Sequence, residues 1–211
     1  MSGIFSSEEF QDISGILPVY ECAQKLFITK ILEMLDSVKY YRENSPIDHI
    51  RERIKTPESI ANKLKRLNLE ITAVNARNCL TDIAGIRIIC SYAKDINQLV
   101  DLLKSIPDAH VLTEKDYISH PKESGYRSYH LIMEITVLFS GKTETIPVEI
   151  QLRTAAMDFW ASLEHKVRYK YSEHIPKHLS DELVICADKI AELDNRMFLI
   201  HDIISLINQD N

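Results

Sequence analysis

Residues 128–152, SYHLIMEITVLFSGKTETIPVEIQL, decide the fold of this chain. Residues 128–139 are rich in β-branched and aromatic side chains, which is typical of a long strand. The SGK sequence at 140–142 predicts a hairpin turn, so residues 144–152 form the returning strand. Because Pro147 cannot donate a backbone hydrogen bond, we expect it at a sheet edge or at a bulge.

Alternation places Glu149, Gln151 and Arg153 on the opposite strand face from the apolar Val148, Ile150 and Leu152. Charged groups flanked by core residues are unusual, because burying an unpaired charge is costly. A bound divalent cation would supply the missing partner. A second carboxylate, Asp82, stands just before the apolar run at 83–91 (IAGIRIICS), which predicts a buried strand. From spacing alone, a solvated sheet face with salt bridges is the favoured explanation of these residues.

Helices are predicted in the sequence before, between and after these strands. Apolar periodicity and capping signals place them at 16–42, from Thr56 to about Leu67, near 73–79, at 94–105 and at 153–170. In the helix at 153–170, Phe159 and Leu163 are predicted to lie in the core. His165 is predicted to have a structural role. The chain is therefore predicted to be an α+β protein, with a mixed sheet of about five strands, surrounding helices and long terminal helices.

The C-terminal helix, predicted at 177–207, has a regular apolar seam. Its members recur in alternating steps of four and three: Leu179, Leu183, Cys186, Ile190, Leu193, Met197, Ile200, Ile204 and Ile207. This heptad pattern is typical of a coiled-coil contact, either with the helix at 16–42 or between subunits. Packing of one long helix on its own domain explains it equally well. His201 and Asp202 are interpreted as solvated helix surface.

Length and composition favour one domain over 1–211, with its core at about 45–172. The chain has 211 residues, 45% of them hydrophobic, and a net charge of −6. Nothing in this balance favours a membrane or a general nucleic-acid partner, so an anionic ligand requires a local basic patch. The four cysteines form no CxxC pair and the N-terminus lacks signal-peptide features, which predicts a reduced, cytoplasmic protein.

Phosphate groups would have to be held by side chains in this protein. Only five glycines occur, and neither a GxGxxG nor a GxxxxGK[ST] motif is present. The candidate cations near the second predicted helix are Arg53, Lys55, Lys63, Lys65 and Arg66. Ser59, Lys63 and Arg66 share one helix face, with Ser59 near the N-terminus, where backbone amides favour an anion. A solvated basic helix is the alternative interpretation.

The segment from Lys115 to Arg127 (KDYISHPKESGYR) is predicted to be a basic loop. It carries Lys122, and Tyr126 follows Gly125 directly. A tyrosine on such a loop can stack on a nucleotide base, although a turn tyrosine that packs locally fits the same sequence.

Four segments together resemble the synthetase domains of RelA/SpoT-type proteins. They are RIKTPESIANKLKR (53–66), DIAGIRII (82–89), DYISHPKESGYRSYH (116–130) and VEIQLRTAAMDFWASLEHKVRYKY (148–171). The resemblance covers about residues 20–205 and is greatest to the small alarmone synthetases of the RelP and RelQ class, with a RelP-like AMDFWASLEHK stretch. It implies a nucleotidyltransferase-like sheet and Mg²⁺-dependent transfer of pyrophosphate from ATP to the 3′-hydroxyl of GTP or GDP.

The resemblance also implies roles for individual residues. Asp82 and Glu149 would be the catalytic magnesium ligands. Arg53, Lys55, Ser59, Lys63, Arg66 and Arg87 would bind ATP, with Arg53 and Arg87 on the adenine. Lys122, Tyr126, His130, Gln151 and Asp158 would bind the acceptor, with Tyr126 stacked on guanine. Ser124 departs from the family pattern, since many relatives have Asn before this glycine, which puts an acceptor contact there in doubt.

Other expectations concern partners and activity. The resemblance suggests a homotetramer assembled through the helical termini, and too few residues precede Arg53 for a hydrolase domain. A catalytically weak regulator that binds nucleotides or single-stranded RNA is the alternative function. Intact carboxylates and basic residues favour the enzyme.

Overall fold

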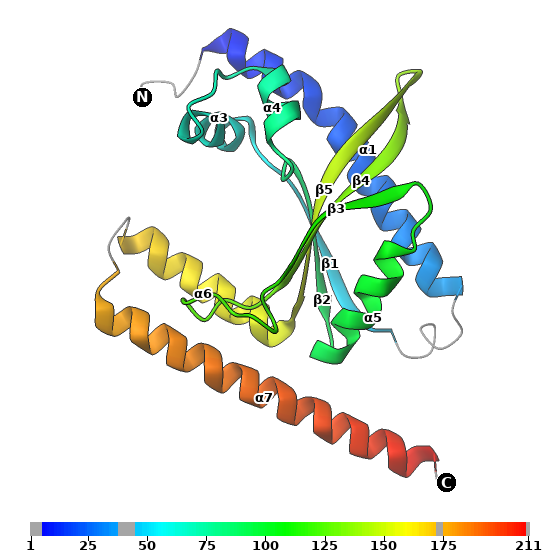
Figure 1. Ribbon diagram of the computed structural model, residues 1–211, viewed down its shortest axis with the longest axis vertical. Coiled ribbons are helices and arrows are strands. Elements are labelled where there is room, and N and C mark those ends of the chain that lie inside the picture. The colour runs from blue at the N-terminus through cyan, green and yellow to red at the C-terminus, as the bar shows by residue number, and fades with distance from the viewer. Residues whose placement is uncertain (1–5, 38–44, 172–174, 210–211) are drawn as a thin grey trace.

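The computed structural model describes residues 6–37, 45–171 and 175–209, and a five-stranded mixed sheet lies at its centre (Figure 1). The strands are β1 (Ile47–Ile54), β2 (Ala84–Cys90), β3 (Ala109–Asp116), β4 (Tyr129–Phe139) and β5 (Lys142–Thr154). Their order is β1-β2-β5-β4-β3, and only the β2–β5 pair is parallel. The predicted α+β class with a five-stranded mixed sheet is therefore confirmed.

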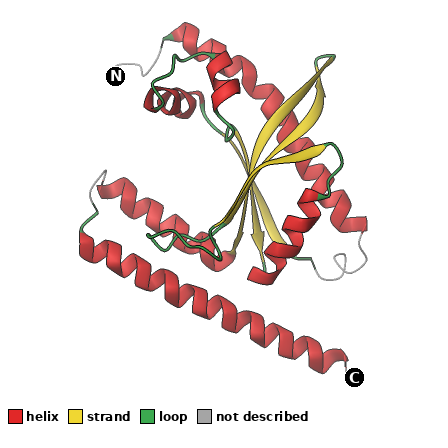
Figure 2. Cartoon of the chain, viewed as in Figure 1, coloured by secondary structure: helices red, strands yellow, loops and turns green. Residues whose placement is uncertain are grey.

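Helices cover both sides of the sheet, which Figure 2 shows in yellow between red helices. They are α1 (Ser7–Ser37), α3 (Pro57–Arg66), α4 (Ala73–Cys79), α5 (Ala93–Lys104), α6 (Ala155–Tyr171) and α7 (Lys177–Gln209). Helices α1 and α5 lie on one side of the sheet and α6 lies on the other, while α7 runs from α6 past the end of the sheet to the start of α5 (Figure 1). The main core forms where α1 and α5 meet the inward face of the strands, through residues such as Phe27, Leu99 and Ile150. No helix in the described ranges is long and apolar enough to cross a membrane.

Helix α1 begins nine residues before the predicted start at 16. Ser6 and Glu9 form a reciprocal cap, in which the Glu9 amide donates to Ser6 Oγ at 3.2 Å and the Ser6 amide donates to Glu9 Oε2. This capping box is a helix start signal, and it was readable in the sequence. Pro18 lies inside the helix, and Ile13 before it is fully buried. The predicted helical residues 38–42 lie outside the described residues.

Two strands were missed in the sequence, and both are sheet edges. β1 and β3 each pair with one neighbour, and most of their side chains are exposed or half-buried. Edge strands without a buried face lack the apolar pattern that identifies a strand. Lys115, predicted in a loop, therefore belongs to β3.

Pro147 lies in β5, which is a central strand for part of its length. The pairing of β5 with β2 begins only at Val148, so residues 142–147 have β4 as their sole strand neighbour. Pro147 is thus locally at an edge, where its missing N–H is tolerated.

Two core predictions on α6 were wrong. The exposed fractions of Phe159 and Leu163 are 65% and 42%, and His165 is exposed as well. Trp160 and Ala161 are buried instead, because α7 packs along that side of α6. The apolar residues of α6 thus form two stripes along the helix. Within the described chain, the stripe with Trp160 and Ala161 packs on α7, whereas the stripe with Phe159 and Leu163 is exposed.

The seam of α7 has two different environments. Its first half packs on α6, where Leu183 and Ile190 contact the cluster around Trp160. In its second half, Leu193, Met197, Ile200 and Ile204 are more than half exposed. The described part of α7 does not pack along α1, which lies apart from it, and the second half of α7 instead passes the start of α5 (Figure 1).

Candidate active site

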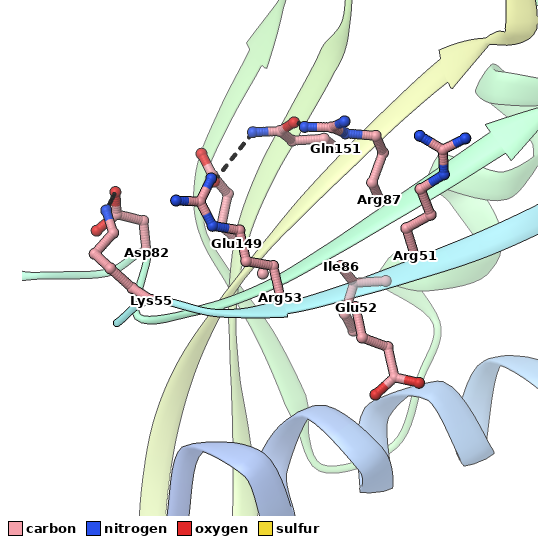
Figure 3. A pocket seen from close by; sticks show the side chains of 10 residues that line it. Arg51, Glu52, Arg53, Lys55, Asp82, Ile86, Arg87, Glu149 and Gln151 are labelled. Atoms are coloured by element: carbon pink, nitrogen blue, oxygen red, sulfur yellow. Dashed lines mark hydrogen bonds and ion pairs between the residues drawn. The ribbon is translucent and has the colours of Figure 1, made fainter. Parts of the chain in front are cut away.

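A cleft of about 370 Å³ opens on the sheet face opposite α1 (Figure 3). Its lining comes from β1, β2, β5 and the segment before β2: Arg51, Glu52, Arg53, Lys55, Asp82, Gly85, Ile86, Arg87, Glu149 and Gln151. Asp82 and Lys55 lie at one end, Arg51 lies at the other, and Glu149 lies between them.

Sheet register brings the polar residues together. One lateral row crosses all five strands, since Arg51 pairs with Arg87, Arg87 with Gln151, Gln151 with His130, and His130 with Lys115. Cross-strand partners share a face and lie within side-chain contact distance. Residues separated by up to 100 positions in the sequence therefore form one polar strip.

Asp82 is held by two lysines. Its Oδ2 lies 2.6 Å from Lys55 Nζ and 2.7 Å from Lys63 Nζ. Burial by itself would raise the pKa of Asp82, but the hydrogen bonds and charges of the two lysines outweigh burial and lower it. Asp82 is therefore ionised at neutral pH.

Glu149 has the opposite environment. Burial and the nearby charge of Asp82 raise the pKa of Glu149, opposed by a hydrogen bond that Gln151 Nε2 donates to Glu149 Oε2 at 3.1 Å. A carboxyl with a raised pKa is a better proton acceptor, so Glu149 is the residue in this cleft suited to general-base chemistry.

The carboxylate pair fits a divalent cation. Asp82 Oδ1 is buried and has no hydrogen-bond partner within the described chain. No cluster of three or more potential metal ligands occurs among the described residues. Mg²⁺ is commonly held by one or two carboxylates together with substrate phosphates, so a third protein ligand is not required.

Predicted ATP-binding residues surround this pair to different degrees. Arg53, Lys55 and Arg87 line the cleft, and Lys63 reaches Asp82 from α3. Ser59 lies in the first turn of α3, which Thr56 caps by accepting from the Ser59 amide at 3.3 Å. Arg66 lies exposed in the last turn, outside the cleft lining.

Asp158 is the most heavily paired carboxylate of the region. Arg87 Nη1 and Arg153 Nη1 contact its Oδ1 at 3.1 and 3.2 Å, and Arg51 Nη1 contacts its Oδ2 at 3.2 Å. Asp158 is only 7% exposed, so three guanidinium groups cover it. Asp158 thus holds Arg51 of β1 and Arg87 of β2 in position. This role of Asp158 was not predicted from the sequence.

Tyr126, His130 and Arg153 form a directional chain. Arg153 Nη2 donates to Tyr126 Oη at 2.6 Å, and Tyr126 Oη lies 2.8 Å from His130 Nε2. A guanidinium can only donate, so Tyr126 Oη accepts from Arg153 and keeps its own hydrogen for donation to Nε2, an arrangement that would place the histidine proton on Nδ1. That Nδ1 lies 3.7 Å from Glu149 Oε1. Burial and the charge of Arg153 lower the pKa of His130 to about 4, so the ring is neutral.

Lys122 lies over the aromatic pair at this end of the site. Its Nζ lies 4.6 Å from the ring centroid of Tyr117 and 5.0 Å from that of Tyr126. The predicted acceptor residues Lys122, Tyr126, His130 and Gln151 thus gather in one place, connected to Glu149 through Gln151.

Sequence reasoning missed several contributors to the site. Arg51 belongs to the unpredicted strand β1. Gln24 of α1 is buried, and its Nε2 donates to the carbonyls of Arg53 at 3.1 Å and Gly85 at 2.7 Å. Gln24 occupies the apolar stripe between Tyr20 and Phe27, and an amide in such a stripe was a readable signal of a buried polar contact.

Comparisons with known proteins show what the chain is similar to. A family profile described as a region found in RelA/SpoT proteins matches residues 52–174. GTP pyrophosphokinase YwaC of Bacillus subtilis is 43% identical over 89% of this chain and 89% of its own length. The crystal structure of small alarmone synthetase 2 from Bacillus subtilis superposes with a TM-score of 0.80 at 42% identity, covering 90% of this chain and 98% of that chain. Small alarmone synthetase 1 from the same organism, bound to its product pppGpp, superposes with a TM-score of 0.77 at 32% identity, over 90% of this chain and 95% of that chain.

Proposed function

Because this chain belongs to the RelA/SpoT family, and within it to the small alarmone synthetases, we propose that its cleft transfers the β,γ-pyrophosphate of ATP to the 3′-hydroxyl of GTP or GDP. One observation carries this proposal: a single sheet face joins the Asp82–Glu149 pair to lysines and arginines on one side and, through Gln151 and Arg153, to Tyr126 on the other. The relatives are named GTP pyrophosphokinases, which supports the enzyme rather than a catalytically weak regulator.

Asp82 and Glu149 would hold a magnesium ion. When bound, this ion neutralises the charge that develops on the transferred phosphates. Lys55 and Lys63 would then exchange Asp82 for phosphate oxygens, since both ammonium groups are within reach of that end of the cleft. Lysines and arginines together outnumber acidic side chains in and beside the cleft, which gives the local positive potential that a chain of net charge −6 needs for binding ATP.

Glu149 would accept the proton of the 3′-hydroxyl. The acceptor oxygen forms a bond to the β-phosphorus as the bond from that phosphorus to the α-phosphate oxygen breaks, and AMP leaves. The neutral His130 lies beside this carboxylate, with its Nδ1 3.7 Å from Glu149 Oε1. Asp158 would act through Arg51, Arg87 and Arg153 as a positioning residue rather than by contact with the acceptor.

A product assay tests this function directly. We expect purified protein, Mg²⁺, and ATP labelled on its γ-phosphate to yield labelled guanosine tetra- or pentaphosphate and an equal amount of AMP. Chelation of the metal is expected to stop the reaction. Label found only in ATP or in inorganic phosphate, with GTP and GDP each supplied, would refute the proposal.

Replacing Tyr126 with alanine should weaken acceptor binding selectively. Loss of one base–aromatic stack is worth about 1–3 kcal/mol, so the KM for GDP should rise at least about fivefold while the KM for ATP changes by less than about twofold. Tyr126→Phe is the matched control, because it keeps the ring and removes only the contacts to Arg153 and His130. Equal changes in the two KM values for Tyr126→Ala would contradict guanine stacking.

We propose that the exposed second half of the α7 seam packs against other copies of the chain in a homotetramer. The double substitution Ile200→Glu and Ile204→Glu places two charges in that contact, each replacing about 1.5–3 kcal/mol of apolar burial. The mass measured by light scattering should therefore fall to that of a dimer or a monomer. Asn195→Glu adds a charge to an exposed position off the seam and should leave the mass unchanged. A double variant with the mass of the unmodified protein would place the assembly contact elsewhere.

A further inference from the structure

The backbone of the loop that carries Tyr126 lies directly on helix α7. Gly125 has φ +86°, and a Cβ at this position would lie 2.6 Å from the Ala187 Cβ and 3.4 Å from the Val184 Cα. Ala187 is 4% exposed, on a helix whose other side chains are mostly exposed or half-buried. The contact therefore requires both a glycine in the loop and a small residue on the helix.

Polar contacts fix the same helix at three further points. Arg127, which follows Tyr126 directly in the loop, has its Nη2 3.1 Å from Asp188 Oδ1. Trp160 Nε1 donates to the Leu183 carbonyl at 2.9 Å, and Thr154 Oγ1 donates to Asp194 Oδ2 at 2.6 Å. Helix α7 is thus attached to the end of β5 and to α6 as well as to the loop.

Tyr126 is held between these contacts. The residue before it rests on Ala187, the residue after it pairs with Asp188, and its own ring packs beside Trp160 and Ala187. Its hydroxyl is fixed from the opposite side by Arg153 and His130. The position of the ring is consequently set jointly by the sheet and by α7.

We propose that α7 is part of the acceptor site, with Ala187 and Asp188 as positioning residues for Tyr126. This inference rests on the proposed function, in which Tyr126 contacts the guanine base. The side chains that would hold ATP lie outside α7, on α3, β1, β2 and the segment between β1 and α3. Changes at Ala187 should therefore separate acceptor binding from donor binding.

Two substitutions at one position test the proposal. Ala187→Leu fills the space that Gly125 occupies and displaces the loop, so the KM for GDP should rise about tenfold or more, with the KM for ATP within about twofold of the unmodified value. Ala187→Gly keeps that space and should preserve the KM for GDP, although glycine inside a helix lowers stability. Cys186→Leu places the same side chain at the neighbouring exposed position and should resemble the unmodified protein.

Charge reversal provides a test that does not depend on the packing of a large side chain. Asp188→Lys repels Arg127, and we expect GDP to bind about threefold to fivefold more weakly in calorimetry, while a non-hydrolysable ATP analogue binds as before. Lys189→Glu, one residue further along the exposed surface, is the matched control. Because calorimetry measures binding, an unmodified protein that binds both nucleotides without forming product would refute the proposed function and leave this test intact. Unchanged GDP binding in both Ala187→Leu and Asp188→Lys, or equal losses for both nucleotides, would overturn the role of α7.

Discussion

Replacing Asp82 with asparagine is expected to reduce pyrophosphate transfer at least about a thousandfold, because it removes a charge that would hold Mg²⁺ at the transferred phosphates. The substitution keeps the size of the side chain, and Asp82 lies at the rim of the sheet, two residues before β2. The fold should therefore persist, which circular dichroism would verify. Asp108→Asn, at an exposed position with φ +62°, is a matched control and should retain full activity.

Binding measurements on the same variant distinguish a metal ligand from a general structural residue. In the unmodified protein, Lys55 and Lys63 are both bound to Asp82. In Asp82→Asn these ammonium groups lose their carboxylate partner and become available to phosphates. An ATP analogue without metal should therefore bind at least as tightly as to the unmodified protein, and added Mg²⁺ should no longer strengthen binding. An active variant, or one whose analogue binding still responds fully to Mg²⁺, would contradict the metal assignment.

The elements that were predictable from sequence are those with a local signal. The helix α3 has Thr56 as its cap, and the hairpin of β4 and β5 has a glycine turn between two apolar strands. Strands β1 and β3 have no such signal, because a sheet edge is stabilised by hydrogen bonds to its neighbour rather than by a buried face. Their position depends on the assembled sheet, which no short window of sequence contains.

Several residues that gather in the cleft were predictable from the sequence, and their connections were not. Lys55, Asp82, Glu149 and Gln151 meet as expected. Asp158 was expected to contact the acceptor, yet its environment depends on arginines from three different elements. Such a contact depends on the pairing of β1 with β2 and of β2 with β5, which is a long-range property.

Replacing Glu149 with glutamine is expected to lower transfer at least about a hundredfold, because the amide cannot accept the 3′-hydroxyl proton. Glutamine also removes one of the two charges that would hold the metal. The KM for ATP should change less than the rate, since Lys55, Arg53 and Arg87 still line the cleft. Rate measurements at saturating nucleotide, alongside those of Asp82→Asn, would show whether both carboxylates are needed.

Stability should change in opposite directions in these two inactive variants. Because burial and Asp82 raise the pKa of Glu149, its ionised form is disfavoured in the folded state. A raised carboxyl pKa contributes stability below the unfolded value of 4.5, and this contribution is lost as pH rises through the folded value. Glu149→Gln should therefore raise the melting temperature by a few degrees at neutral pH without metal, and this gain should disappear in acid.

Asp82 is the reverse case, because its lysine partners lower its pKa. Its ionised form contributes stability above the unfolded value of 3.8, and this contribution is lost as pH falls through the folded value. Asp82→Asn should therefore lower the melting temperature at neutral pH, where Glu149→Gln raises it. Melting curves of both variants from acid to neutral pH, without metal, test this contrast. A decrease for Glu149→Gln at neutral pH would mean that Glu149 stabilises the fold through its contacts with Gln151 and His130, and is not a destabilised charge retained for proton transfer.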